Sequence, residues 1–307
     1  MSVELYLYRY RINCEVKSPI YFPTYKGSTL RGIFGHTLKE VICISKRKVC
    51  EECPLKESCI YTYIFETPTL EAKYKNAPHP YIIVPPLTEK RLFFEGEKFF
   101  FEISLIGKAN DYLPYIIYAL LKMQDIGVGI RKGKFKIKEI QALFLKEEPK
   151  IVYDPEKDKL EKVDNKISFS DFLNETYNKN ELKLIFQTPL RLKNKGKLII
   201  RELPFLVFME RLLERIYLLS YYHCNFKTFD YKEILEKSEE VKIIESNFSW
   251  YDWERFSKRK GRMKLGGVIG SIRYRGNFNE FFPYIKMGEY IHIGKATVFG
   301  LGKYKIF

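Results

Sequence analysis

Long apolar runs, tryptophan and histidine are all scarce in this chain. It has two tryptophans and four histidines, and no hydrophobic run approaches the roughly 20 residues that a membrane-spanning helix needs. The first residues are charged and typical of a strand, without the apolar core of a secretion signal. We therefore expect a cytoplasmic protein with no membrane partner, in which the six cysteines stay reduced.

Basic and aromatic residues, by contrast, are plentiful. The 307 residues include 53 Lys and Arg against 38 Asp and Glu, a net charge of +15, and 16% of the residues are aromatic. A chain of this length and hydrophobicity is globular and long enough for two domains. The surplus of positive charge favours a polyanionic partner, most often nucleic acid. The alternative is a basic protein from an AT-rich or heat-loving organism, because lysine, isoleucine and glutamate are common and glutamine is rare.

The pattern of apolar residues predicts an α+β fold in which one plan occurs twice. The first half alternates strands and helices as β-α-β-β-α-β, the split βαβ plan, with one cysteine-rich insertion at 43–63. The second half repeats the plan and ends in a strand pair that includes a glycine-rich loop. We expect one domain at 1–146, a linker or surface excursion at 147–180 and a second domain at 181–307. The predicted elements are strands at 3–16, 80–85, 98–106, 133–145, 182–191, 241–249 and 264–275, and helices at 28–42, 111–123, 203–222 and 278–285.

The two halves also end alike, with Gly127-Val128-Gly129 before a Lys-Phe-Lys-Ile strand and Gly300-Leu301-Gly302 before Lys-Tyr-Lys-Ile. This similarity indicates an internal duplication, although two short matches also arise by chance. In the C-terminal copy, glycines 294, 300 and 302 stand near Lys295. Glycine lets backbone approach a ligand closely, and exposed N–H groups bind anions, so a phosphate-bearing polymer fits this loop. A tight turn is the alternative.

Four of the six cysteines fall within 17 residues, as Cys43, Cys50, Cys53 and Cys59. A Cys-x₂-Cys step lets two thiolates face one ion, and two flanking cysteines complete a tetrahedral set. The residues between them are too polar for a core, so a metal would supply folding energy. We expect structural zinc here, with an iron–sulfur cluster or unligated thiols as the alternatives. Cys14 and Cys224 are expected in the core.

A basic segment from Arg255 to Arg275 contains no acidic residue. Basic side chains hold phosphates, and aromatic faces stack unpaired bases. A solvated hairpin with core tryptophans is the alternative. The basic residues are Arg255, Lys258, Arg259, Lys260, Arg262, Lys264, Arg273 and Arg275, and the aromatic residues that flank or interleave them are Trp250, Tyr251, Trp253, Phe256 and Tyr274.

The histidines differ in their expected surroundings. His36 falls well away from the apolar face of the first helix and lies near Lys39 and Gly32, so it can meet a phosphate; pairing with Glu40 is the alternative. His292 alternates with Ile291 and Ile293, and we expect it to face away from the core. His79 and His223 are expected to be structural.

Together these residues resemble the CRISPR-associated endoribonucleases that cut precursor CRISPR RNA, which belong to the RAMP superfamily. The resemblance covers most of the chain. It is carried by residues 30–36, the cysteine cluster ending at 59–61, and residues 188–192, 253–257, 265–270, 292–295 and 299–302.

The resemblance implies two tandem ferredoxin-like (RRM-like) domains with a glycine-rich loop near the C-terminus. It implies metal-independent cleavage, in which the 2′-hydroxyl attacks the scissile phosphate and leaves a 2′,3′-cyclic phosphate or a 3′-phosphate. His36 is then the general acid or base, with Lys39, His292 and Lys295 as weaker candidates. Zinc would be structural, and catalysis would need no cofactor. RNA contacts are expected from Arg31, Arg255, Lys258, Arg259, Lys260, Arg262, Lys264, Gly294, Lys295, Gly300 and Gly302.

Two other functions remain open at this stage. One is a non-cleaving RAMP subunit that binds guide RNA within a CRISPR interference complex, and the other is an unrelated zinc-containing RNA-binding or scaffold protein. An exposed His36 favours the endoribonuclease and a buried one the non-cleaving subunit. The expected partner is CRISPR repeat RNA, and we expect a monomer or a homodimer.

Overall fold

The computed structural model describes residues 3–45, 49–69, 77–226, 230–257 and 261–307. The chain forms two compact units. The N-terminal unit is Tyr6–Ile167 together with Tyr222–Cys224, and the C-terminal unit contains Ser168–Tyr221 and Asn225–Phe307. Among the described residues, no helix is both long and apolar enough to cross a membrane.

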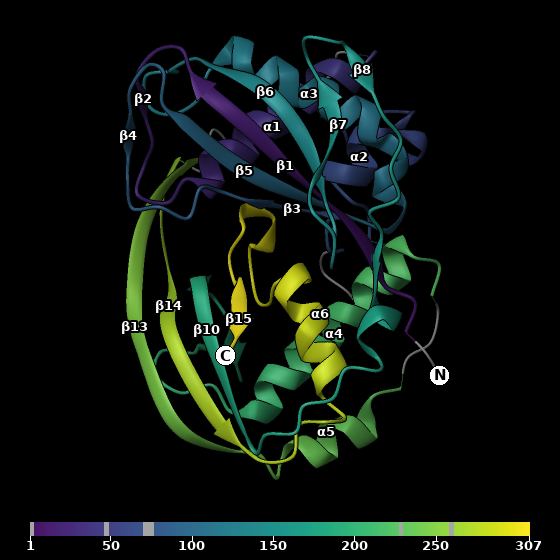
Figure 1. Ribbon diagram of the computed structural model, residues 1–307, viewed down its shortest axis with the longest axis vertical. Helices are drawn as coiled ribbons and strands as arrows, with labels where there is room; N and C mark the ends of the chain where they lie inside the picture. The colour runs from purple at the N-terminus through teal and green to yellow at the C-terminus, as the bar shows by residue number, and fades with distance from the viewer. Residues whose placement is uncertain (1–2, 46–48, 70–76, 227–229, 258–260) are drawn as a thin grey trace. The chain divides into compact units, whose positions relative to one another are not determined.

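The N-terminal unit is an antiparallel sheet with α1 and α3 packed together on one face (Figure 1). Four of its strands follow the order β3-β5-β1-β6, with the second, third, first and fourth strands of the plan side by side. This is the split βαβ arrangement expected from the sequence. Its elements are β1 Tyr6–Val16, β2 Ile20–Tyr21, α1 Gly27–Ile42, η1 Lys56–Ser58, α2 Ile60–Phe65, β3 Tyr81–Val84, β4 Leu92–Phe93, β5 Lys98–Ile106, η2 Gly107–Tyr112, α3 Leu113–Ile126, β6 Phe135–Leu143, β7 Lys150–Asp154, β8 Lys159–Leu160 and β9 Ile167–Ser168.

The core of this unit forms where the sheet meets the helices. Leu30, Phe34 and Leu38 on α1 and Ile116 on α3 have fully buried side chains, as the 3.6-residue period of the apolar positions requires. α1 begins one residue earlier than predicted, and Ser28 is not its N-cap; Lys26 occupies that position without a side-chain cap. The core positions of Cys14 and Cys224 are confirmed, at 2% and 4% exposed.

The segment 147–180, which we expected to be a linker or surface excursion, contributes the strands β7 and β8 to the N-terminal unit. β7 pairs with β6, and β8 pairs with β7, so both strands extend the edge of the N-terminal sheet beyond the four-strand plan. Their short and mostly exposed sequences carry little hydrophobic periodicity, which is why the pattern of apolar residues did not predict them.

The C-terminal unit repeats the plan in the order β13-β14-β10-β15. In Figure 1 its strands lie beside α4 and α6, and β13 and β14 form a long hairpin. The predicted final strand pair is wrong, because β15 is the one strand there and the glycine-rich loop precedes it. The elements are η3 Phe169–Phe172, β10 Glu181–Leu190, β11 Lys193–Asn194, β12 Lys197–Leu198, α4 Phe205–His223, α5 Lys232–Ser238, β13 Lys242–Ser257, β14 Gly261–Arg275, α6 Phe282–Ile291, η4 Thr297–Phe299 and β15 Tyr304–Ile306.

Candidate nucleic-acid interface

His36 is exposed on α1, as its position relative to the apolar face predicted. One turn earlier on the same helix, Gly32 is also exposed, and a Cβ added there would meet no atom within 4 Å. The surface beside the imidazole is therefore open on this side. An exposed imidazole next to a residue without a side chain can approach a phosphate that carries bulky neighbours.

A second row of α1 residues, Arg31, Gly35 and Lys39, faces the short helix α2. The guanidinium of Arg31 lies 3.7 Å from the centroid of the Phe65 ring, and its Nε donates a hydrogen bond of 3.0 Å to Tyr81 Oη. Phe65 in turn stacks on Tyr81, with ring centroids 6.0 Å apart. Arg31 is thus held by an aromatic stack of its own unit, and its role in RNA binding stays a prediction.

Lys39, one turn beyond Gly35 in this row, is directed toward the cysteine segment. Its Nζ lies 5.4 Å from the centroid of Tyr61 and hydrogen bonds to the sulfur of Cys50. Partial burial lowers the pKa of Lys39, but this hydrogen bond and the charge of Cys50 outweigh it and raise the pKa above the ordinary value. A lysine that stays protonated can stabilise phosphate charge but cannot act as a general base near neutral pH.

The glycine-rich loop, His292–Gly302, is a tightly folded segment of the C-terminal unit. His292, Gly294, Ala296, Gly300 and Gly302 all have positive φ, between 59° and 89°. A Cβ at Gly302 would come within 1.8 Å of the carbonyl oxygen of Ile293, so only glycine fits there. The close neighbour of Gly302 is the protein's own backbone, as in the tight turn that we gave as the alternative, and close approach to a phosphate-bearing ligand stays a prediction.

Hydrogen bonds within the protein already use two of the amides that we expected to bind phosphate. Gly302 N donates to Pro189 O at 3.0 Å, and Gly300 N donates to Thr297 O at 2.7 Å. Lys295 N likewise donates to Arg191 O at 2.8 Å, whereas the Lys295 side chain is exposed. The Lys295 ammonium is therefore better placed to meet RNA than these three amides.

His292 does not face away from the core, so that expectation is wrong. Its side chain is 1% exposed, and its Nδ1 lies 3.2 Å from the carbonyl oxygen of Leu301. The residue comes directly after α6 in a left-handed conformation, so the strand alternation assumed for Ile291-His292-Ile293 does not exist. Arg215 Nε donates to the carbonyl oxygens of Ile291 and His292 at 2.9 Å each and so caps the end of α6. A buried imidazole in this setting holds the loop, and a catalytic role for His292 stays a prediction.

The structure describes the basic hairpin in part. Residues Lys258, Arg259 and Lys260 lie outside the described part of the chain, and so do the side chains of Arg255, Arg262 and Lys264. At the other end of β14, Arg273 and Arg275 form ion pairs with Glu181, and Arg273 also pairs with Glu245. The two tryptophans differ: Trp253 is 4% exposed, whereas Trp250 is 39% exposed and donates from its indole N–H to Asp252.

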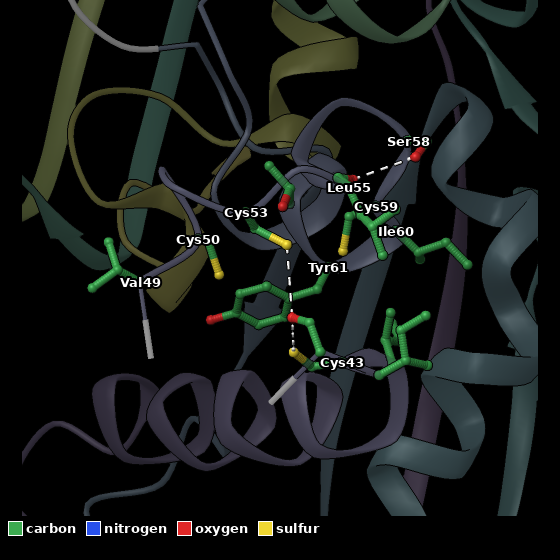
Figure 2. A pocket seen from close by; sticks show the side chains of 13 residues that line it. Cys43, Val49, Cys50, Cys53, Leu55, Ser58, Cys59, Ile60 and Tyr61 are labelled. Atoms are coloured by element: carbon green, nitrogen blue, oxygen red, sulfur yellow. Dashed lines mark hydrogen bonds between the residues drawn. The ribbon is translucent and has the colours of Figure 1, made fainter. Parts of the chain in front are cut away.

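The four clustered cysteines line one cavity between the end of α1 and the start of α2 (Figure 2). All four are partly buried free thiols, and the Ser45 hydroxyl lies 3.7 Å from the sulfurs of both Cys43 and Cys53. Within the described ranges, however, no three histidine, cysteine, aspartate or glutamate side chains are placed to hold a metal ion. The expected zinc site is therefore not formed in this structure.

The other two histidines are structural, as expected. His223, which the contacts assign to the N-terminal unit, is fully buried. Its Nε2 lies 2.7 Å from Pro78 O, which can only accept, so Nδ1 accepts from the Tyr63 hydroxyl at 3.2 Å. His79 Nδ1 lies 3.0 Å from Thr67 Oγ1.

The sequence did not reveal two features of the N-terminal unit. The first is α2, whose Tyr61 contacts Lys39 and whose Phe65 contacts Arg31. In the sequence, this short helix was indicated only by an aromatic pair at i and i+4. The second is Glu102, which pairs with Arg9 at 2.8 Å and Arg11 at 2.9 Å across the sheet. That contact depends on the register of β1 with β5, which the sequence does not reveal.

Comparison with known proteins places this geometry in a family. Residues 5–165, more than half of the chain, match the family model AF_1859_N, described as an N-terminal domain. Residues 184–304 match the model described as "CRISPR-associated endoribonuclease Cas6". The first model covers more than half of the chain, so the chain belongs to the family that this model defines, and its C-terminal part matches the Cas6 type.

Individual relatives are distant in sequence. An uncharacterized protein of Archaeoglobus fulgidus is 25% identical over 301 residues, which cover 95% of this chain and 96% of the relative. A Cas6 product complex from Thermus thermophilus has a TM-score of 0.55 at 14% identity, covering 98% of this chain and 100% of that one. A partial Cas6-RT-Cas1–Cas2 complex gives a TM-score of 0.59 at 13% identity; the match covers 99% of this chain but under half, 46%, of that one. At these identities the structural likeness concerns the fold alone.

Proposed function

We propose that this protein is an endoribonuclease that binds CRISPR repeat RNA and cleaves precursor CRISPR RNA into guide RNAs. The observation that carries the proposal is the exposed His36 on α1, beside the open surface at Gly32, in a protein of the Cas6/RAMP type. A buried imidazole would have favoured the non-cleaving subunit.

In the proposed reaction, the 2′-oxygen of the nucleotide upstream of the cut attacks the phosphorus. The bond from phosphorus to the 5′-oxygen breaks, which leaves a 2′,3′-cyclic phosphate and a 5′-hydroxyl. One proton leaves the 2′-hydroxyl and one is delivered to the 5′-oxygen. Imidazole titrates near pH 6.5 and can take or give such a proton. Because the nucleophile belongs to the RNA, we propose that cleavage needs no metal-activated water.

Electrostatic attraction would supply much of the binding. The chain carries a net charge of +15, and the exposed Lys295 stands on the glycine-rich loop. We propose that this lysine and the basic hairpin from Arg255 hold RNA backbone, in the manner of phosphate contacts that position a nucleic acid. The buried His292 has no direct part in this scheme.

Single-turnover cleavage of the repeat RNA in EDTA tests the proposal. The wild type should cleave, and the products should carry a cyclic or terminal 3′-phosphate. His36→Ala should lower the rate by roughly 10²–10⁴-fold while affinity for the repeat stays nearly unchanged. Glu236→Ala is the control, because Glu236 is an exposed residue of α5 with no part in the proposed site, and this variant should cleave at the parental rate. Binding without any cleavage by the wild type would instead identify a guide-RNA-binding subunit.

A further inference from the structure

The described part of the segment between α1 and α2, residues 43–45 and 49–59, has no fully buried side chain. None of its described residues from Cys43 to Cys59 is buried: the apolar Ile44, Val49 and Leu55, which line the same cavity as the cysteines, are still 82%, 46% and 43% exposed. The four cysteines and Lys56 are the only described residues of the segment that are partly buried. The four thiols are therefore the metal-binding groups of this part of the chain, and they share their cavity with apolar side chains.

Hydrogen bonds nevertheless order the backbone at 50–56, within the described part of this segment. Cys53 N donates to Cys50 O at 3.1 Å and Lys56 N donates to Cys53 O at 3.0 Å, so the Cys-x₂-Cys step forms a tight turn. Cys43 directly follows α1, and Cys59 directly precedes α2. Each cysteine thus stands on a backbone position fixed by a helix end or a turn. A short segment without a core needs another source of folding energy, and a bound metal is the usual one.

The four thiols also share one space. They line a cavity of about 200 Å³, and Figure 2 shows their sulfur atoms around it, with the Tyr61 ring among them. In this structure the sulfurs are not close enough together to ligate an ion. Each sulfur, however, is one rotatable bond from its backbone, so a change of χ1 moves it without moving the chain. The Ser45 hydroxyl that touches Cys43 and Cys53 would give way to the ion.

We propose that Cys43, Cys50, Cys53 and Cys59 bind one Zn²⁺ ion in a tetrahedral structural site that forms when the metal binds. Four thiols at this spacing suit zinc, with Zn–S bonds of about 2.3 Å. On binding, the thiols release their protons to solvent and no electron is transferred. Four thiolates on Zn²⁺ leave a net charge of −2, and the ammonium of Lys39 already contacts the Cys50 sulfur. That contact places a cation where the charge of the site would need one.

The site would tie the end of α1 to the start of α2. Because Tyr61 and Phe65 on α2 contact Lys39 and Arg31, the metal would fix the row of α1 side chains beside His36. This is a positioning role, and it does not depend on the proposed cleavage: a zinc site could exist in a protein that cuts no RNA.

Metal content of the full-length protein, purified without added metal, tests the proposal directly. We expect about one zinc per chain by elemental analysis, released by a mercurial reagent that titrates four thiols together. Replacement of zinc by Co²⁺ should give the intense visible bands of tetrahedral thiolate coordination. Cys53→Ala should contain less than a tenth of the wild-type zinc, whereas Cys224→Ala, which removes a thiol outside the cluster, should keep it.

Two results would overturn the proposal. One is wild-type protein with no metal and four independently reactive thiols, or with disulfides among them. The other is iron with the absorbance of an iron–sulfur cluster, since that excludes a single-ion site. If Cys53→Ala does not fold, the metal content and the cobalt spectrum of the wild type still show whether the four cysteines bind one zinc ion. Proteolysis of the wild type after zinc release should then cut first between Cys43 and Cys59.

Discussion

The ring of Phe65 lies against the backbone of Gly35 so closely that a Cβ at position 35 would fall within 1.9 Å of Phe65 Cζ. The ring has little room to retreat, because Arg31 lies over it and it also stacks on Tyr81. Contact between α1 and α2 therefore depends on a glycine at this point.

Gly35→Ala should destabilise the protein by about 1–3 kcal/mol, because the methyl group overpacks the contact with Phe65. Gly32→Ala on the same helix is the matched control. It has free space for a Cβ, and alanine favours helix over glycine by about 0.5–1 kcal/mol, so it should be neutral or stabilising. Urea unfolding of the two variants measures the difference, and equal stabilities would contradict the packing described here.

Glu102 gives a prediction about acid stability. Burial raises the pKa of Glu102, but the charges and hydrogen bonds of Arg9 and Arg11 outweigh burial and hold the pKa below the ordinary 4.5. A carboxyl with a lowered pKa stabilises the fold above pH 4.5, and that stabilisation is lost as the pH falls through the folded-state value. Glu102→Gln should cost about 1–3 kcal/mol near pH 7 and flatten the loss of stability below pH 4.5. Chemical unfolding from pH 3 to 7 tests this, and parallel curves would argue against it.

Lys295 should contribute one phosphate contact. Lys295→Ala should weaken RNA binding and reduce the slope of log K against log salt by about 0.7 if the RNA there is single-stranded. Lys237→Ala is the control, because this lysine pairs with Glu233 and Glu280 on another surface of the same unit and should leave the slope unchanged. Filter binding over a range of salt concentrations supplies the measurement. Identical slopes for wild type and Lys295→Ala would place the RNA elsewhere.

His292 should behave as a residue that holds the glycine-rich loop. His292→Ala removes the contact with Leu301 O and leaves that buried carbonyl without this partner, at a cost of about 1–3 kcal/mol. His292→Asn should be less damaging, because asparagine tolerates positive φ and can still donate a hydrogen bond. Thermal unfolding ranks the variants. A His292→Ala protein of wild-type stability that has lost cleavage would return His292 to a catalytic role.

The sequence predicted the two split βαβ halves because their longer elements have a clear hydrophobic period. Helices such as α4 are amphipathic, and in strands such as β1 and β5 apolar and polar residues alternate. It also placed His36 on the exposed side of α1 for the same reason. It failed where a tertiary contact decides the local structure. α2 has only six residues and is fixed by Phe65 against Gly35, and His292 follows a helix end that Arg215 caps from another element. The pairing of Glu102 with two arginines depended on strand register, which leaves no trace in the pattern.

The close fit of Gly35 and Phe65 also constrains how this family can change over time. A substitution of Gly35 alone would be unfavourable. A large ring at position 65 would be equally unfavourable in a chain that has any residue other than glycine at position 35. The two positions should therefore change together, with a smaller residue at 65 wherever a homologue carries a side chain at 35. Chains that break this rule should have lost α2 or rotated it around α1.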